Sequence, residues 1–221
     1  MIDPATISYL TELTANNDRD WFKAHRDRYE AALANAKAFA ERVVFEMKQG
    51  DDIEDYRMYR IYRDVRFSKD KTPYNPRFGF SLKRLKPRLR GGYFVDLEPT
   101  QTRVVVGFWA PNGDDMALIR SHIESDGDRL REVVESPQIN SVFGSLVGNG
   151  LKTAPRGFTQ DHPDIDLLRM KQFLFKTAFS VEETLSPDFV DEVVFTLRAV
   201  RPFFDHMSEV LGHDVNGVSL Y

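Results

Sequence analysis

The chain has 221 residues, of which 42% are hydrophobic and 12% aromatic, and it carries a formal net charge of −4 at pH 7. This composition lets the chain bury most of its apolar surface, which excludes a disordered protein and favours a single domain over residues 1–221. The absence of cysteine excludes disulfides, thiolate catalysis and cysteine-ligated zinc.

The N-terminal sequence, MIDPATISYL, has no basic segment followed by the apolar run and cleavage site of a secretory signal. No stretch elsewhere approaches the roughly 20 apolar residues that a membrane span requires. We therefore expect a cytoplasmic protein without a membrane partner. The sequence points to no particular oligomeric state.

Two helices are predicted at the start of the chain. Residues Pro4 to Leu13 form the first, because proline suits the first turn and apolar residues recur there at a spacing of three. Asp18 or Asp20 can cap a second, long helix that runs to about Gln49 along an apolar stripe with spacings of three, four and seven. Gly50 suits the end of that helix.

The spacing of apolar residues changes to two from Arg77 onward, which predicts strands. Residues 77–83, 93–97 and 103–109 each alternate between apolar and polar side chains, and short turns connect them as in an antiparallel meander. Residues 170–179 contain three phenylalanines and two lysines and predict a further strand.

Helical spacing returns between and after these strands. Residues 113–137 predict a pair of helices, and residues 187–200 and 202–211 predict two more that begin at proline. Residues 144–157 are rich in glycine and are expected to form a loop with at most one short strand near Leu151. Because most strands come in one block between helices, we expect an α+β fold, with an antiparallel meander sheet flanked by helices at both termini.

Positive charge is concentrated in residues 57–90. This tract holds twelve Lys and Arg residues against Asp64 and Asp70 alone, a charge of +10, whereas the rest of the chain carries −14. Cations gathered this closely repel one another, so they need acidic partners in the fold, full solvation or an anionic ligand. One interpretation is a solvated strand face whose cations pair with Asp96, Glu98 or helix carboxylates. The other is a ligand site.

The first half of the tract contains most of the candidate site. In YRMYRIYRDVR tyrosines are interleaved with arginines, and guanidinium groups bind phosphate or carboxylate bidentately and stack on aromatic rings. In FSKDKTPYNPRF two prolines force an irregular path, while ammonium and hydroxyl groups offer donors to an anion. The same residues also suit plain packing and a connection that keeps a sheet edge soluble. The candidate ligand-binding residues here are Arg60, Arg63, Arg66, Lys69, Lys71 and Tyr74.

Four blocks of sequence resemble a known family. They are NNDRDWFKAHRDRYE, RDVRFSKDKTPYNPRF, GGYFVDLEP and LKTAPRGFTQDHPDIDLLRMKQF, in this order. On these blocks the chain is similar, from about Leu10 to Phe204, to the family catalogued as domain of unknown function 2461. The resemblance implies one domain and carries no established activity, cofactor or catalytic residue. The last block adds Lys152 and Arg156, which would complete one cationic pocket if they lie near residues 60–71.

Other chemistry finds little support in the sequence. The five histidines form no HxH, HxxxH or HExxH motif, and DHPDID lacks the glycine and distant glutamate of a calcium loop, so no metal site is predicted. Asp164 is interpreted as a helix N-cap. Ser68 lies in a basic loop without a GxSxG elbow, and glycine-rich phosphate loops are absent, so neither a catalytic residue nor a cofactor is predicted.

We expect the domain to bind a ligand with phosphate or carboxylate groups through its Arg-, Lys- and Tyr-rich segment. Two alternatives stay open. One is a nucleic-acid-binding module that uses the tract to Arg90 along the phosphates and the tyrosines for stacking, and the other is a structural or protein-interaction domain. A pI near 5.8 favours an anionic small molecule over nucleic acid. The residues leave open whether the protein is an enzyme.

Overall fold

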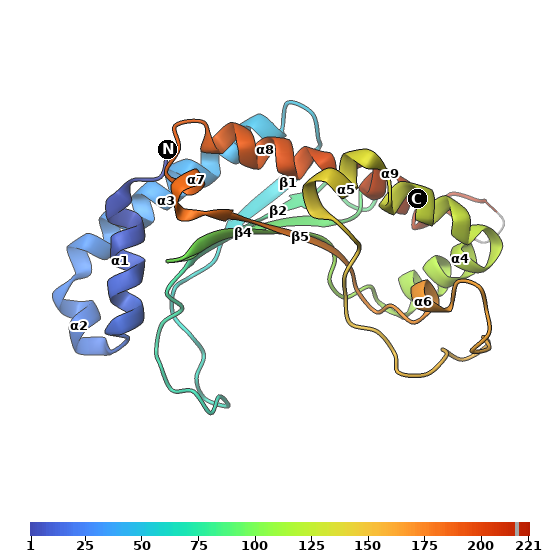
Figure 1. Cartoon of the computed structure of the whole chain (residues 1–221), viewed down its shortest axis with the longest axis horizontal. Coiled ribbons are helices and arrows are strands. Elements are labelled where there is room, and N and C mark those ends of the chain that lie inside the picture. The colour runs from blue at the N-terminus through green and yellow to red at the C-terminus, as the bar shows by residue number, and fades with distance from the viewer. Residues whose placement is uncertain (215–216) are drawn as a thin grey trace. The chain divides into compact units, whose positions relative to one another are not determined.

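A computed structural model describes residues 1–214 and 217–221. The described residues form a five-stranded antiparallel sheet with the order β1-β2-β3-β4-β5, so each strand pairs with its neighbours in sequence. The strands are β1 (Ile53–Met58), β2 (Phe78–Arg84), β3 (Gly92–Leu97), β4 (Gln101–Phe108) and β5 (Phe173–Ser180). This arrangement, drawn in Figure 1, confirms the predicted α+β fold with a meander sheet and helices at both ends.

Helices precede the sheet, interrupt it between β4 and β5, and follow it. The first group is α1 (Pro4–Ala15), α2 (Arg19–Ala24) and α3 (Arg26–Met47). The second is α4 (Gly113–Val134), α5 (Pro137–Phe143) and α6 (Ile165–Leu168), and the third is α7 (Val181–Thr184), α8 (Phe189–Ala199) and α9 (Arg201–Val210). None of these helices has the length and apolarity that a bilayer crossing requires, within the described part of the chain.

Alternating apolar positions explain why the central strands form. Phe78, Phe80 and Leu82 of β2 are buried, as is Val104 of β4. Because alternate side chains of a strand point to one face, these residues define the face of the sheet that is packed. The edge strand β1 buries Ile53 and leaves the rest of its side chains partly or fully exposed.

The chain divides into two compact units. Unit 1 comprises residues 1–82, 94–104 and 178–195, and unit 2 comprises residues 83–93, 105–177 and 196–221. This division concerns compactness alone, so the single domain expected over residues 1–221 stays a prediction.

In unit 1, helices α3 and α8 lie over the same face of the strands (Figure 1). Phe39 of α3 stacks on Phe189 of α8 with ring centroids 5.2 Å apart, and it meets Phe80 of β2 edge to face at 6.0 Å. Aromatic pairs of these geometries contribute about 0.5–1.5 kcal/mol each beyond the burial of their area. These contacts fix α3, and α1 packs against α3 in turn.

In unit 2, two adjacent phenylalanines at the start of α9 form the centre of the core. Phe204 contacts Tyr93 of β3 at 5.0 Å and Phe108 of β4 at 5.7 Å between ring centroids. Phe203 contacts Phe175 of β5 at 5.4 Å. Helix α4 packs against α9, so both helices are held on the strands of this unit.

The long helix predicted from Asp18 to about Gln49 is two helices in the structure. The Asp18 carboxylate caps α2 by accepting the backbone N–H groups of Asp20 and Trp21 at 2.9 Å. The break lies at His25, whose φ is −113°, whose ring stacks on Trp21 at 4.1 Å, and whose Nδ1 lies 2.8 Å from the Trp21 carbonyl oxygen. The apolar residues keep their helical spacing in the sequence across His25. The sequence pattern therefore does not reveal that α2 ends there.

Three short elements, β1, α5 and α7, have no counterpart in the sequence prediction. Strand β1 carries adjacent acidic residues, Glu54 and Asp55, and shows no clear alternation. Helix α7 is one turn closed by a capping box, in which Ser180 Oγ accepts the Glu183 N–H at 3.2 Å and the Glu183 carboxylate accepts the Ser180 N–H at 2.6 Å. Elements this short bury too few side chains for periodicity to reveal them.

The glycine-rich segment at residues 144–157 contains no helix or strand, as predicted, and pairs with later residues through single bridges from Val147 and Gly150. Asp164 occupies the predicted N-cap position of α6, but its side chain makes no capping hydrogen bond. Its carboxylate instead accepts a hydrogen bond from Arg131 at 3.0 Å.

Candidate functional site

Residues 59–77, which connect β1 to β2 in unit 1, form a segment that we call the basic loop. It contains six Lys and Arg residues and two aspartates. A single antiparallel bridge between Tyr62 and Tyr74 closes its base. On either side of this bridge the backbone hydrogen bonds run from Arg63 N to Pro73 O at 2.9 Å and from Asn75 N to Ile61 O at 2.7 Å. The two arms of the loop therefore run side by side up to its tip.

Helix α2 supports the base of the basic loop. Phe22 stacks on Tyr74 with ring centroids 4.1 Å apart and meets Tyr62 edge-on at 5.8 Å. Asn17, just before α2, bonds the backbone of Tyr74 through both ends of its side-chain amide. The sequence blocks NNDRDWFKAHRDRYE and RDVRFSKDKTPYNPRF therefore form one structural element.

A tight turn forms the tip of the loop. The backbone N–H of Ser68 donates to the carbonyl oxygen of Val65 at 3.3 Å, which places Arg66 and Phe67 at the two central positions of the turn. The ammonium group of Lys71 closes the turn by donating to Val65 O at 2.9 Å. Phe67 is 97% exposed, so its ring contributes nothing to the packing of the loop.

Both aspartates of the loop are tied to arginines. The backbone N–H of Thr72 and the guanidinium of Arg63 lower the pKa of Asp70 to about 2. The Arg66 guanidinium, 2.7 Å away, lowers the pKa of Asp64. Both carboxylates therefore act as structural partners of the loop arginines.

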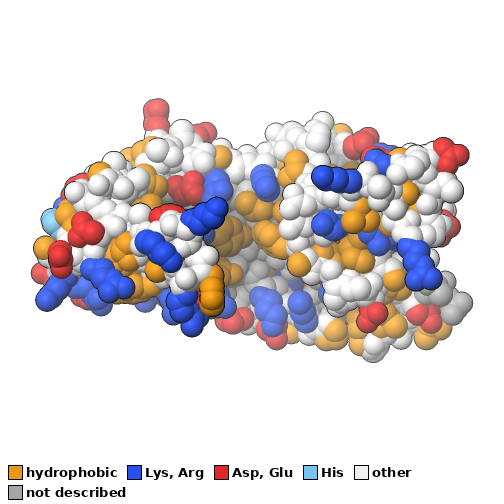
Figure 2. Space-filling model, turned by 90° about the horizontal axis from the view of Figure 1, so that it is seen from below, with side chains coloured by type: hydrophobic (Ala, Val, Ile, Leu, Met, Phe, Trp, Pro, Cys, Tyr) orange, Lys and Arg blue, Asp and Glu red, His pale blue; other side chains and the backbone are white. Residues whose placement is uncertain are grey.

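Three cations of the loop form no ion pair with a carboxylate in the described residues, although the charge of Arg60 helps to lower the pKa of Asp64. Within residues 1–214 and 217–221, Arg60 and Lys69 make no hydrogen bond or ion pair and are exposed, and the Lys71 ammonium bonds backbone carbonyls. Figure 2 shows Lys and Arg side chains gathered beside apolar ones over the part of the molecule that holds α2 and the basic loop. An exposed cation without a carboxylate partner is the part of such a site that is free to bind an anion.

Ser68 and Lys71 are spaced as in an SxxK motif, in which the lysine serves the reactive serine. The Lys71 ammonium instead donates to backbone carbonyl oxygens at 2.9 and 3.5 Å. Among the residues that the structure describes, no hydrogen bond links it to the Ser68 hydroxyl, so the geometry gives no support to a serine nucleophile here.

The remaining candidate residues are Tyr74, Lys152 and Arg156. Tyr74 is 5% exposed and anchors the base of the loop, so a direct ligand contact by its ring stays a prediction. Lys152 and Arg156 are exposed on the segment between α5 and α6, in unit 2. The other six candidates lie in unit 1, and the pocket expected from both basic blocks stays a prediction.

The tract of residues 57–90 is not one exposed cationic surface. Arg84 is fully buried in unit 2, where its guanidinium donates to Asp205 at 2.8 Å and to the carbonyl oxygen of Arg90 at 2.9 Å. Arg90 itself pairs with Asp115 of α4. Pairing with helix carboxylates is therefore confirmed for Arg84 and Arg90, although the buried Arg84 does not belong to a solvated strand face.

In unit 1, Asp96 is the carboxylate partner of Arg77. A single oxygen, Oδ2, accepts hydrogen bonds from Arg77 on β2 and from Arg103 on β4, the latter at 3.0 Å. Burial raises the pKa of Asp96 above its usual value, although the two guanidinium groups act in the opposite direction. Arg77 is thus a structural cation rather than a candidate for ligand binding.

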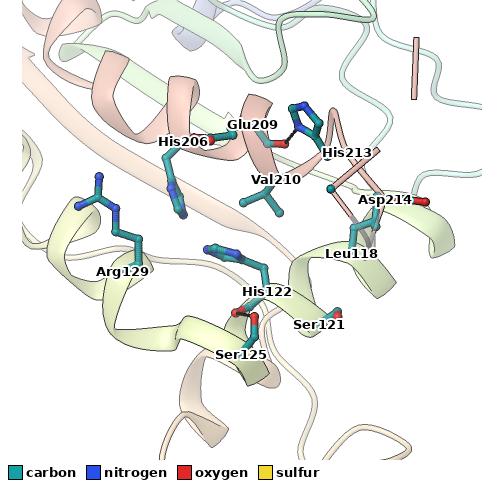
Figure 3. Close-up of a pocket in the computed structure, with 11 residues that line it drawn as sticks. Leu118, Ser121, His122, Ser125, Arg129, His206, Glu209, Val210, His213 and Asp214 are labelled. Atoms are coloured by element: carbon teal, nitrogen blue, oxygen red, sulfur yellow. Dashed lines mark hydrogen bonds between the residues drawn. The ribbon is translucent and has the colours of Figure 1, made fainter. Parts of the chain in front are cut away.

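A separate cavity of about 600 Å³ opens between α4 and α9 in unit 2. Figure 3 shows His122 of α4 and His206 of α9 pointing toward one another, and their ring centroids are 4.9 Å apart. The Nε2 atoms of both rings are buried without a hydrogen-bond partner in the described residues. Burial, the other imidazole and Arg129 lower the pKa of His206 to about 4, and burial lowers that of His122.

Sequence patterns give only an indirect signal of this cavity. His122 and Arg129 lie seven positions apart, but α4 is kinked between them at Asp126, whose φ is −155° and ψ 63°, so helical spacing alone does not bring them together. The pairing with His206 joins residues 84 positions apart, and no motif marks it. The described residues contain no group of three or more His, Asp or Glu side chains arranged to hold a metal ion.

The fold and the site together define an α+β protein with a cationic loop between the first two strands of a meander sheet. The family model described as conserved hypothetical protein, domain of unknown function 2461, matches residues 5–206. The chain therefore belongs to this family, as its sequence blocks indicate. No curated protein and no solved structure matches the chain.

Proposed function

We propose that this protein binds a ligand bearing phosphate or carboxylate groups, and that the basic loop holds it. The observation that carries the proposal is the presence of Arg60 and Lys69 as exposed cations that form no hydrogen bond or ion pair in the described residues, on a loop whose base is fixed. Lys71 adds a third charge that only backbone carbonyls contact. We propose a cytoplasmic location together with this binding function.

Among the paired arginines of the loop, Arg66 remains the most accessible to an anion. The Arg66 side chain is 77% exposed, and its bond to Asp64 spans only two residues. Exposed ion pairs are screened by water and contribute little to stability, so a ligand phosphate can replace such a carboxylate. Arg63 is less exposed and bonds both Asp70 and Thr72. In the proposal it holds the arm of the loop that contains these two residues.

The fixed base supports binding because it reduces the conformational entropy that a loop loses when it orders around a ligand. The bridge between Tyr62 and Tyr74, together with the stack of Phe22 on Tyr74, holds the two arms before any ligand arrives. The tip is similarly held by the turn from Val65 to Ser68. A preorganised loop of this kind retains more of its interaction energy as affinity.

Thermal denaturation with inorganic phosphate, tripolyphosphate and citrate tests the proposal, with sodium chloride at matched ionic strength as the reference. A ligand at 100 times its Kd stabilises the folded protein by about 2.7 kcal/mol, a shift of several degrees. We expect at least one polyanion to stabilise the wild-type chain. The double variant Arg60→Ala/Lys69→Ala should lose most of this shift.

The matched control is the double variant Lys37→Ala/Arg42→Ala on α3. It removes the same two residue types from exposed positions of unit 1 that make no hydrogen bond or ion pair in the described residues. This variant should respond to the polyanion as the wild-type chain does. Equal losses in both double variants, or no stabilisation by any of the anions, would contradict the proposal.

A further inference from the structure

We infer that the anion held by the basic loop is a single-stranded nucleic acid, with one base stacked on Phe67. This inference rests on the proposed function, because it needs the cations of the loop for the phosphates. It differs from a general anion site by assigning a role to the aromatic rings of the loop.

Phe67 is the most exposed large hydrophobic side chain of the described residues, at 97%. Single exposed apolar residues are common and need no explanation. Phe67, however, occupies a central position of a hydrogen-bonded turn between two cations, Arg66 and Lys69. A phenyl ring in this position is presented outward by the backbone, and a flat ring that faces water offers a surface on which a base can stack.

Guanidinium groups accompany the exposed rings of this region. The Arg66 guanidinium lies 5.9 Å from the centroid of Phe67, and that of Arg57 lies 5.2 Å from the centroid of Tyr59. Arg26 donates to the Tyr62 hydroxyl at 3.4 Å. A base on a ring and a phosphate on the adjacent cation are the two contacts that proteins repeat along a single strand.

The distribution of the rings favours a single strand over a membrane surface. Tyr59 and Tyr62 are 40% and 43% exposed, and they lie at the start of the loop, whereas Phe67 lies at its tip. A bilayer would take up only the tip residue, and the burial of one phenyl ring does not anchor a protein to a membrane without a second signal. Rings spaced along the loop instead match successive bases of a strand.

The same features disfavour double-stranded DNA. In a duplex the base faces are covered by stacking, so Phe67 would gain contact only by separating base pairs. The chain also carries a net charge of −4, and the basic loop itself holds only six Lys and Arg residues. The short row of loop cations suits a few phosphates of a flexible strand.

Fluorescence anisotropy with a labelled dodecamer of thymidylate tests the inference. The reference ligand is an abasic dodecamer that has the same length and the same number of phosphates but no bases. We expect the thymidylate strand to bind about 5-fold to about 150-fold more tightly, which corresponds to 1–3 kcal/mol per stacked base. Its affinity should fall as salt rises, because binding releases counterions.

Two substitutions of Phe67 separate stacking from apolar contact. Phe67→Ala and Phe67→Leu should both reduce the thymidylate affinity toward that of the abasic strand, because leucine is apolar but has no ring. Phe45, which is 61% exposed on α3 of unit 1, provides the control, and Phe45→Leu should bind as the wild-type chain does.

Each alternative outcome overturns the inference in a recognisable way. Equal affinity for the thymidylate and abasic strands, lost in Arg60→Ala/Lys69→Ala, would leave the proposed anion binding intact and remove the base. Absence of binding to both strands and to tripolyphosphate would overturn both proposals. Binding to vesicles with 20% phosphatidylserine that survives in Phe67→Leu but not in Phe67→Ala, without base-dependent strand binding, would assign the loop to a membrane surface.

Discussion

The side-chain amide of Asn17 is paired with the backbone of Tyr74 through two hydrogen bonds. Asn17 Nδ2 donates to the carbonyl oxygen of Tyr74 at 3.0 Å, and Asn17 Oδ1 accepts the Tyr74 N–H at 3.1 Å. An amide presents its donor and acceptor side by side, as the backbone of a neighbouring strand does. Asn17 therefore completes the pairing of Tyr74 on the side away from Tyr62 and connects the start of α2 to the basic loop.

Asn17→Ala should loosen the basic loop. The substitution leaves two backbone groups of Tyr74 without partners in a partly buried place, which costs about 1–3 kcal/mol. We expect faster hydrogen exchange at the amides of residues 61–75 and weaker binding of polyanions. Asn16→Ala is the control, because the Asn16 amide bonds only Glu12 of α1. Unchanged exchange in the loop of Asn17→Ala would show that the two hydrogen bonds do not hold it.

Arg84 and Lys69 belong to the same basic tract in the sequence, but only the substitution of Arg84 should lower the stability of the fold. Arg84→Ala empties a fully buried position and removes the hydrogen bonds to Asp205 and to the Arg90 carbonyl oxygen. We expect a loss of about 2–5 kcal/mol in the free energy of unfolding, measured with urea.

Lys69→Ala should leave that free energy unchanged within about 0.5 kcal/mol, because the exposed ammonium makes no hydrogen bond or ion pair in the described residues. Arg84→Lys should also destabilise, since an ammonium cannot reproduce the fork of a guanidinium. Wild-type stability in Arg84→Ala would contradict the structural role assigned to this residue.

Local patterns predict the elements of this fold better than its site. The alternation of Phe78, Phe80 and Leu82 is enough to place β2, because strand burial repeats within a few residues. The pairing of Arg84 with Asp205 joins positions 121 apart, and no local pattern encodes it. The sequence therefore indicates that the tract needs negative partners but cannot say which cations already have them.

The candidate site shows the same limit of local reasoning. The basic composition of two sequence blocks predicts Arg60 and Lys69 as site residues. No sequence pattern distinguishes Phe67 from other apolar residues. Only the turn from Val65 to Ser68 reveals that the ring faces water. In the same way, His122 and His206 become a pair only when α4 packs against α9.

Gly107 should tolerate no side chain. Its φ is +136°, and a Cβ atom there would lie 2.1 Å from the carbonyl oxygen of Phe173 and 2.9 Å from the Cα of Leu174. Gly107→Ala must therefore push β4 away from β5, and we expect it to cost more than about 2 kcal/mol in thermal or urea denaturation.

Gly113→Ala provides the matched control for this prediction. Gly113 begins α4, and a Cβ atom there would meet nothing within 4 Å. Alanine at this position should leave the stability unchanged or raise it by up to about 1 kcal/mol, because it restricts the unfolded chain. Equal effects of the two substitutions would show that the close approach of Gly107 to Phe173 does not constrain the sheet.

The stability of the chain should depend on pH through His206. Burial, His122 and Arg129 lower its pKa from 6.5 to about 4 in the folded protein, whereas Glu209 and Asp126 act weakly in the opposite direction. Between these two values the unfolded chain binds more protons than the folded one. The stabilisation is therefore complete above pH 6.5 and is lost as the pH falls toward 4.

His206→Gln should flatten this dependence, because glutamine does not titrate. Each unit of pKa difference corresponds to about 1.4 kcal/mol, so the wild-type chain should lose a few kcal/mol relative to the variant between pH 7 and pH 4.5. Carboxylates that titrate in the same range are common to both proteins, and the difference between the two urea-denaturation series isolates the histidine. His162→Gln, outside the cavity, should keep the wild-type slope. If His206→Gln kept that slope as well, the buried imidazole pair would not be the group that senses pH.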